Sequence, residues 1–219
     1  MEKITFNKKV KKTFKSIKKA ENGKKDFFIP VYNHNQQIAF LKPITESNLI
    51  DSPVNHKIIK LLTSWRNANS KWYPTVFEAT EEGTKKWLRD QVINMDDRIL
   101  FMVETLDGTP FGHMGLYRGE ADNFIRGRQD ILAGGMTYAL RTMLKWVFND
   151  LNVDELFLSV FLDNKKAISF YERCGFKEVY KIPLKKTKEK NEIKWEEITE
   201  NNHDKSERYF SVMHISCKR

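Results

Sequence analysis

The sequence has few cysteines and no long apolar run, and both absences limit what the protein can be. Its 219 residues include two cysteines, Cys174 and Cys217, and no Cys-x-x-Cys motif. Two thiols cannot build a disulfide framework, which favours a reducing compartment. The chain has no apolar run of about 18 residues that could cross a membrane as a helix. The N-terminus also lacks the apolar segment of a secretory signal. We therefore expect a cytoplasmic protein without a membrane span, and we assign no metal site.

The aromatic content indicates a folded protein. Hydrophobic residues make up 40% of the chain and aromatic residues 12%, which is too rich for a disordered polypeptide. A chain of this length favours one domain with a packed core.

The net charge of +9 is concentrated at the N-terminus. Residues 1–25 hold ten lysines and two glutamates, whereas residues 26–219 are nearly balanced in charge. We interpret the first segment as a basic arm and the second as the domain. Such an arm attracts phosphates, RNA or anionic lipid in a salt-dependent manner. The simpler interpretation is a solvated extension, although Val10, Phe14 and Ile17 share a helical face that could dock on the domain.

The spacing of apolar residues predicts helices and strands that alternate along the domain. Strands are expected over 37–45, 98–105, 111–117, 121–127, 155–162, 177–183 and 209–216, and helices over 55–69, 80–93, 134–149 and 165–173. Residues 184–208 are highly charged and poor in aliphatic side chains, so we interpret them as an excursion before the last strand. This order predicts a mixed α/β sheet in one domain.

A glycine-containing loop is the first candidate site. Residues 123–136 (NFIRGRQDILAGGM) run from a strand through a loop to Gly134 and Gly135, where a helix begins. Backbone amides in such a loop, together with a helix N-terminus, suit a pyrophosphate. Paired glycines before a helix are also common as plain turn residues, so this signal alone is unspecific.

A second segment carries a more specific pattern. Residues 160–177 read VFLDNKKAISFYERCGFK. The pattern comprises Asn164, Ala167, Phe170-Tyr171-Glu172 and Gly175-Phe176, and it resembles the N..A..FYE..GF signature of the GNAT superfamily of N-acetyltransferases. The order of elements from about residue 38 to 216 is also similar to that family. The resemblance implies one α/β domain with a mixed, mostly antiparallel central sheet flanked by helices, and acetyl-CoA as the acetyl donor.

The resemblance also implies which residues hold acetyl-CoA. By position, the strand near 124–126 would pair with the pantetheine arm, and the glycine loop would hold the pyrophosphate. The residues implied are Phe124, Ile125, Arg126, Arg128, Gly134, Gly135, Met136, Asn164, Ala167 and Tyr171. Arg126 and Arg128 would supply positive charge or lie on an ordinary surface. The loop departs from the family pattern, because Ile131 stands three residues before Gly134, where glutamine or arginine is usual.

Tyr171 is the residue that the resemblance most directly implies in catalysis. It lies four residues after Ala167 on the same helical face, where the family binds the CoA sulfur. Its phenol could protonate the departing thiolate, whose thiol has a pKa of roughly 8.5, like cysteine. The alternative is a structural tyrosine that packs the helix on the sheet.

The group that removes the proton from the acceptor amine has several candidates. Glu120, Asp122 and His113 lie near the central strands. By strand alternation, His113 should share a face with Phe111 and Tyr117. A lone histidine in a strand is commonly a core residue, and the two carboxylates also suit turns. A water chain to solvent would serve without a dedicated base.

The acceptor site is implied by a finer resemblance. Residues 62–67 and 84–88 resemble a GNAT branch that includes ribosomal-protein, polyamine and nucleotide-linked amino-sugar acetyltransferases. Trp65, Arg66, Trp72 and Tyr73 stand where the acceptor loop of that branch lies, and their side chains suit stacking on a base or sugar. Alternatively, the two tryptophans pack the neighbouring helices.

We expect a small-molecule amine acceptor, a nucleotide-linked amino sugar. The alternatives are a polyamine or a protein N-terminus. In a different class, the protein would be a module that binds RNA or ribosomes through its basic arm.

Overall fold

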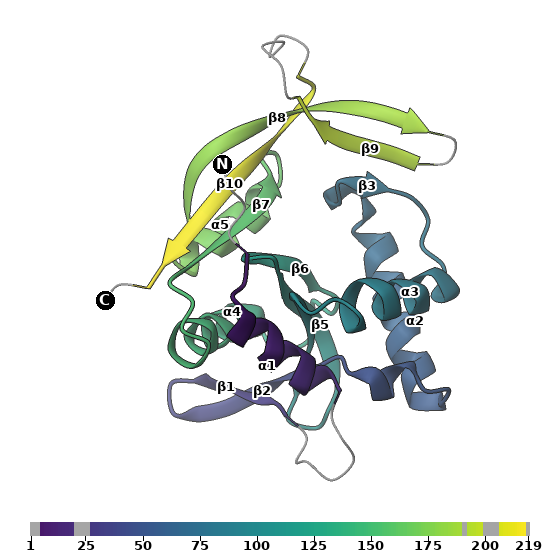
Figure 1. The fold of residues 1–219 in the computed structure, drawn as a ribbon, viewed down its shortest axis with the longest axis vertical. Helices are drawn as coiled ribbons and strands as arrows, with labels where there is room; N and C mark the ends of the chain where they lie inside the picture. The colour runs from purple at the N-terminus through teal and green to yellow at the C-terminus, as the bar shows by residue number, and fades with distance from the viewer. Residues whose placement is uncertain (1–4, 20–26, 190–191, 199–205, 218–219) are drawn as a thin grey trace.

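The computed structural model describes residues 5–19, 27–189, 192–198 and 206–217 (Figure 1). Its strands form one sheet in the order β1-β2-β4-β5-β6-β7-β10-β8-β9-β3. The strands are β1 (Ile29–Asn33), β2 (Gln36–Pro43), β3 (Thr75–Val76), β4 (Arg98–Thr105), β5 (Pro110–Tyr117), β6 (Glu120–Arg126), β7 (Glu155–Phe161), β8 (Lys177–Glu189), β9 (Glu192–Glu197) and β10 (Arg208–Ser216). Neighbouring strands are antiparallel except β6 and β7, which are parallel. The mixed, mostly antiparallel sheet that the resemblance implied is therefore confirmed.

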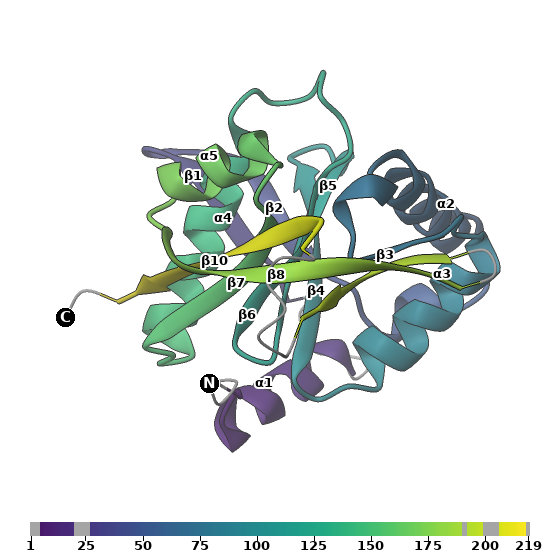
Figure 2. The same ribbon diagram turned by 90° about the horizontal axis from the view of Figure 1, so that it is seen from above.

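Helices cover both faces of the sheet (Figure 2). The α-helices are α1 (Lys8–Lys18), α2 (Pro53–Ala68), α3 (Glu81–Trp87), α4 (Gly135–Lys145) and α5 (Lys165–Arg173). The short helices η1 (Glu46–Leu49) and η2 (Ser70–Trp72) are 3-10 turns, and η3 (Leu88–Ile93) and η4 (Trp146–Asp150) are π-helical extensions of α3 and α4. Side chains of α1, α4 and α5 join one buried cluster, and those of α2, α3 and η3 join a second. Among the described residues, no helix is long and apolar enough to span a membrane.

Local sequence signals set several helix ends. The hydroxyl of Thr80 accepts a hydrogen bond from the Gly83 amide at 3.0 Å, and Asn164 Oδ1 accepts one from the Ala167 amide at 3.3 Å. Threonine and asparagine are favoured at helix N-caps because a side-chain oxygen can satisfy an amide of the first turn. After α5, Gly175 takes φ +102°, a left-handed conformation that glycine adopts without strain.

The basic arm is not a solvated extension over its described part. Helix α1 buries Val10 and Phe14 completely, and the Phe14 ring lies 6.1 Å from that of Trp146. Lys18 is also buried, and its Nζ donates to the carbonyls of Val92 (2.7 Å), Arg98 (2.9 Å) and Met95. The solvated interpretation is therefore wrong for α1, because its apolar face is needed to complete the core. The other lysines of α1 remain on its outer side.

Residues 184–208 contain more regular structure than their charge indicates. Residues 184–189 continue β8, and β9 pairs with β8 from Leu184↔Glu197 to Glu189↔Glu192. The opposite edge of β9 pairs with β3 at Thr75↔Lys194 and Val76↔Ile193. Much of the expected excursion is therefore a hairpin that joins the end of the sheet to the segment after α2; residues 199–205 lie outside the described part.

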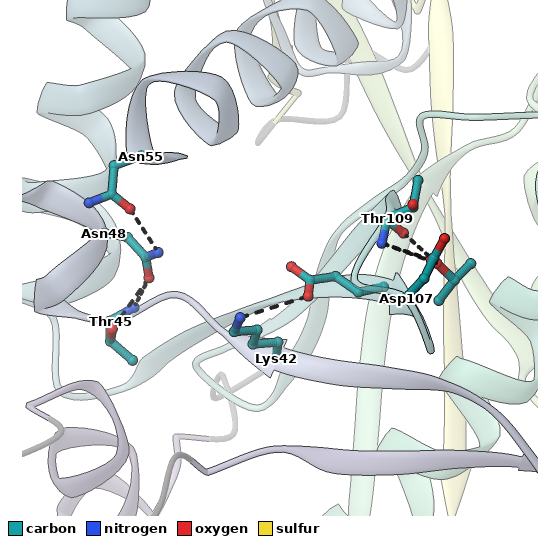
Figure 3. Close-up of polar contacts among 8 residues, drawn as sticks. Lys42, Thr45, Asn48, Asn55, Asp107 and Thr109 are labelled. Carbon is teal, nitrogen blue, oxygen red and sulfur yellow. Dashed lines mark hydrogen bonds and ion pairs between the residues drawn. The ribbon is translucent and has the colours of Figure 1, made fainter. Parts of the chain in front are cut away.

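Polar contacts fix the connection between β2 and α2 (Figure 3). The Thr45 amide donates to Asn48 Oδ1 at 2.8 Å, and Asn48 Nδ2 donates to Asn55 Oδ1 in the first turns of α2 at 3.4 Å. Nearby, Lys42 lies 3.9 Å from Glu104, whose pKa is raised by burial. The turn after β4 is held by Asp107, which accepts from the Thr109 amide at 3.2 Å. The contacts of Asn48 therefore tie the turn after β2 to the first turns of α2.

A register shift between β4 and β5 changes the face on which one predicted residue lies. The pairing moves between Val103↔Gly112 and Glu104↔Pro110. As a result, Phe111 joins the cluster under α4, whereas the His113 ring stacks on Trp65 of α2. The expectation that His113 shares a face with Phe111 is wrong, because the irregularity interrupts strict alternation.

Candidate active site

Strands β6 and β7 meet at one point and then separate. Their only pair among the described residues is Glu120↔Phe157, at the start of β6. Beyond it, residues 121–126 are not hydrogen-bonded to β7. We call these two facing strand edges the β6–β7 opening. An extended ligand with amide groups could pair with the open edge as an additional strand does.

A bulge in β6 lies at the β6–β7 opening. Ile125 pairs with His113 and Asp122 with Gly115, so two β6 residues, Asn123 and Phe124, stand opposite one residue of β5. Asn123 has φ +54°, a left-handed value that is uncommon outside glycine. The bulge redirects the backbone of β6 next to Phe124.

His113 of β5 holds this bulge in place through a hydrogen bond to its backbone. Its Nδ1 lies 2.7 Å from the Asn123 carbonyl, and because a carbonyl can only accept, Nδ1 carries the proton. The ring is buried, which lowers its pKa to about 4. A neutral imidazole with so low a pKa is a weak base. The environment of His113 therefore favours a role in positioning the bulge over the role of general base that the sequence suggested.

Tyr171 projects from α5 toward the β6–β7 opening. Its ring meets Phe124 of β6 edge-on at 5.7 Å between centroids and lies 6.0 Å from Phe176. Burial raises the pKa of the hydroxyl, and the charge of Asp122 adds to this effect. Tyr171 is therefore a neutral O–H donor at physiological pH, located beside the open edge.

Of the two carboxylates predicted from the sequence, Asp122 acts electrostatically on the residues around the bulge. It accepts from Arg98 Nη2 at 2.7 Å and from Asn123 Nδ2 at 2.7 Å. Its charge influences the pKa values of Tyr171, Tyr73 and His113 alike. Asp122 thus lies among three of the predicted site residues. The other carboxylate, Glu120, lies at the closed end where β6 meets β7.

The end of α2 covers the same region from the opposite side of the sheet. Trp65 is buried and stacks on His113 at 6.1 Å between ring centroids. Arg66 lies over the Tyr73 ring, 3.7 Å from its centroid, and donates from Nη2 to the Thr75 carbonyl at 2.6 Å. Burial raises the pKa of Tyr73 and lowers that of Arg66. The structure therefore brings Trp65, Arg66 and Tyr73 together beside Asp122.

Trp72 lies apart from these three residues. It packs with Phe161, Trp195 and Phe210 in a separate cluster beside β9 and β10. Arg208 lies 5.5 Å from the Trp72 ring centroid and forms a double hydrogen bond with Asp163 at 2.9 Å for each contact. The contacts of Trp72 thus fasten the segment after α2 to the last strands, so a packing role explains them.

The glycine loop after β6 is organised by its own arginines. The Arg126 guanidinium donates to the carbonyls of Arg128 (3.2 Å), Gln129 (3.0 Å) and Ile131 (3.1 Å). Arg128 pairs with Asp130 through two hydrogen bonds of 2.9 and 2.6 Å. Both side chains therefore shape the loop, and the charge of Arg128 is largely compensated there.

The loop ends at the N-terminus of α4. Gly134 precedes the helix with φ +75°. The Gly135 amide donates to the Leu132 carbonyl at 2.8 Å and the Thr137 amide to the Gly134 carbonyl at 2.9 Å. A Cβ on Gly135 would lie 2.9 Å from the Leu132 side chain, so a larger residue here would have to displace that side chain. The helix start presents backbone donors to an anion beside the β6–β7 opening.

Arg98 is the site residue that sequence reasoning missed. Its guanidinium lies 3.9 Å from the Tyr117 ring centroid and holds Asp122 in place. The two partners are 24 residues apart and come together because β4, β5 and β6 pair in series. No local motif marks such a pair.

These features define a class of protein: an α/β enzyme in which two separating strands, a glycine loop at a helix start and a tyrosine-bearing helix surround one site. A family model described as "Acetyltransferase (GNAT) domain" matches residues 50–177, more than half of the chain. The chain therefore belongs to the GNAT family and is an N-acetyltransferase that uses acetyl-CoA.

Solved structures agree with this fold. The spermidine N-acetyltransferase from Vibrio cholerae in complex with CoA and spermine is 17% identical, covers 81% of this chain and 95% of its own, and has a TM-score of 0.57. A spermidine/spermine N-acetyltransferase from the same organism in complex with manganese ions is 19% identical, covers 82% and 92%, and has a TM-score of 0.53. At these identities the similarity establishes the fold. No curated protein matches the sequence.

Proposed function

We propose that the protein transfers the acetyl group of acetyl-CoA directly to a primary amine of a small molecule, with a polyamine as the first acceptor class. The observation that carries this proposal is that Tyr171 and Asp122 both contact the bulge in β6, Tyr171 through the Phe124 ring and the Asp122 carboxylate through Asn123. The hydroxyl would protonate the departing thiolate, and the carboxylate would hold the acceptor ammonium before it loses its proton.

The residues at the β6–β7 opening fit acetyl-CoA. The open edge of β6 at 124–126 would pair with the amides of the pantetheine arm. Since the Gly135 and Thr137 amides are already used, we assign the amides of Gly134 and Met136 to the pyrophosphate. Asn164 and Ala167 lie at the start of α5, on the side from which Tyr171 reaches the opening.

Each residue then has a defined part in the reaction. Acetyl-CoA supplies a thioester whose carbonyl carbon forms the new C–N bond with the amine as the C–S bond breaks. Asp122, oriented by Arg98, holds the acceptor ammonium, which loses a proton to water or to the carboxylate. Tyr171 donates its proton to the departing sulfur and regains one from solvent. His113 keeps the bulge in place, and Trp65 closes the site from α2.

Two observations bear on the acceptor. The similar solved structures are of spermidine N-acetyltransferases, one of them with spermine bound, which supports a polyamine over the amino sugar expected from the sequence. Asp122 supplies a carboxylate for such a cation. A nucleotide-linked amino sugar is the second candidate, because Arg66 and the rings of Trp65 and Tyr73 would suit an anionic, ring-shaped molecule better than a polycation.

An acceptor panel tests the proposal. Release of free thiol from acetyl-CoA would be measured with spermidine, spermine, a nucleotide-linked amino sugar and a short peptide with a free N-terminus. We expect turnover with the polyamines. Turnover confined to the amino sugar would replace the acceptor class and keep the mechanism, whereas turnover confined to the peptide would contradict both small-molecule candidates.

A further inference from the structure

Helix α1 lies at the surface of the molecule (Figure 1) and carries a row of exposed lysines. The row consists of Lys8, Lys12, Lys15 and Lys19, the last at the C-cap of the helix. Residues at these spacings share one helical face, and at about 1.5 Å per residue the four lysines extend over about 16 Å. We call them the lysine row. They lie outside the match to the acetyltransferase family, which begins at residue 50.

The core of the protein fixes the lysine row in position. Phe6, Val10 and Phe14 of the opposite side are buried in the main cluster. At the other end of the helix, the Lys18 ammonium donates to three backbone carbonyls of residues 92–98. Helix α1 is therefore held at both ends. A ligand of the lysine row does not have to order the helix, which removes one entropic cost of binding.

The charges of the lysine row oppose the stability of the helix that carries them. The first turn of α1 contains Lys8 and Lys9 and no acidic residue, although the positive end of the helix dipole disfavours cations there. Within the row, each neighbouring pair places like charges three or four residues apart, which destabilises a helix. Among the described residues, Asp96 pairs with Lys11 at 3.9 Å, and no carboxylate pairs with the row. A bound polyanion would relieve this repulsion.

The surroundings of the lysine row favour a nucleic-acid duplex over a membrane or a single strand. A helix that binds a membrane surface buries an apolar face in it, but Val10 and Phe14 are already completely buried in the core. Single strands are bound by stacking of bases on aromatic side chains, and the exposed residues of α1 include no aromatic one. The exposed Phe27 packs on Trp146, the residue that the buried side of α1 contacts. The phosphates of a duplex require only cations.

We propose that the lysine row binds the phosphate backbone of a double-stranded nucleic acid. The ammonium groups bind phosphates, which carry no sequence information, so binding is independent of base sequence. At 3.4 Å per base pair along the duplex axis, a row of about 16 Å extends over about five base pairs. This binding is a second function beside acetyl transfer, and it does not depend on the identity of the acetyl acceptor.

The salt dependence of binding tests the proposal on the full chain. Its affinity for a fluorescent DNA duplex of about 20 base pairs would be measured by anisotropy over a series of salt concentrations. Each neutralised phosphate contributes about −0.9 to the slope of log K against log salt concentration. In the variant Lys8→Gln/Lys12→Gln/Lys15→Gln, the slope should therefore become shallower by about 2–3, and the affinity at low salt should fall at least about 10-fold. Glutamine is a good helix former, so the fold should be kept, and circular dichroism would verify this.

The matched control Lys57→Gln/Lys60→Gln/Lys86→Gln removes the same charge from exposed positions of α2 and α3 and should keep the wild-type slope. An RNA duplex of the same sequence should respond to both variants as the DNA does, because the phosphates are shared. Equal slopes for the wild type and the α1 variant, or equal losses in the α1 and control variants, would overturn the proposal. Binding to phosphatidylserine vesicles without binding to either duplex would also overturn it. None of these measurements involves acetyl-CoA, so the proposed function stands or falls separately.

Discussion

The indole of Trp65 lies so close to Gly127 that a Cβ on Gly127 would be 1.9 Å from Trp65 Cε2. The Trp65 ring also stacks on His113 of β5, with 6.1 Å between the ring centroids, so it packs against both β5 and the end of β6. This contact couples α2, which carries the residues of the proposed acceptor site, to the first residue of the glycine loop. Gly127 is required here for space.

The substitution Gly127→Ala should therefore displace Trp65. We expect a loss of about 1–3 kcal/mol in the free energy of unfolding, typical of overpacking, and a higher KM for the acceptor. Chemical denaturation and steady-state kinetics would measure both. In a Trp65→Ala background the same glycine substitution should cost little, because the obstructing ring is gone. An equal cost in both backgrounds would contradict the contact.

Asp122→Asn should impair use of the acceptor more than binding of the cofactor. Removing the charge that holds the acceptor ammonium should lower kcat/KM for the amine by about 10-fold or more, with the Kd for acetyl-CoA close to wild type. Melting temperature must be measured alongside, because Arg98, with a side chain only 12% exposed, loses its ionised partner. The control Asp96→Asn alters a carboxylate that is 60% exposed. Unchanged kinetics in Asp122→Asn would remove this residue from the mechanism.

The buried His113 should make the fold sensitive to mild acid. Burial lowers its pKa from 6.5 to about 4, so the unfolded chain binds a proton first as the pH falls. The free energy of unfolding should therefore decrease between about pH 6.5 and pH 4, and less so in His113→Gln. Equilibrium unfolding across this range measures the difference. Parallel curves for the two proteins would show that His113 does not titrate in this way.

The buried Lys18 should make the free energy of unfolding depend on pH in the alkaline range. Burial lowers its pKa from 10.5 to about 8, so the unfolded chain holds the proton more tightly. Stability should therefore rise as the pH increases from about 8 to 10.5, and this rise should be smaller in Lys18→Met. At neutral pH the variant should be less stable by about 1–3 kcal/mol, because one buried and two partly buried hydrogen bonds to carbonyls are lost. A Lys18→Met protein as stable as wild type would contradict the docking of α1.

Features set by neighbouring residues could be predicted from the sequence. The caps at Thr80 and Asn164 and the left-handed Gly175 depend on a few adjacent residues, and the pattern around Tyr171 located a tyrosine that does face the β6–β7 opening. The packing of Trp72 could not be assigned, since its partners near Phe161 and Arg208 are distant in the sequence. The pairing of Arg128 with Asp130 is local, but from the sequence its role was open between cofactor binding and an ordinary surface position.

Features that depend on long-range pairing were missed. Lys18 binds carbonyls more than 70 residues away, and β3 pairs with β9 across most of the chain. The pairing of Arg98 with Asp122 follows from the register of three strands, and the register shift next to Phe111 breaks the alternation on which a face was predicted. No short window of sequence contains this information.

The kinetic effect of Tyr171→Phe tests the central claim most directly. With an acceptor that turns over, kcat should fall by about 10²-fold or more, because the departing sulfur loses its proton donor. The Kd for acetyl-CoA and the melting temperature should stay near wild type, since the ring contacts with Phe124 and Phe176 are kept. Tyr180→Phe, at a position 41% exposed, is the matched control. A Tyr171→Phe enzyme with wild-type kcat would contradict the assignment of the reaction to this tyrosine.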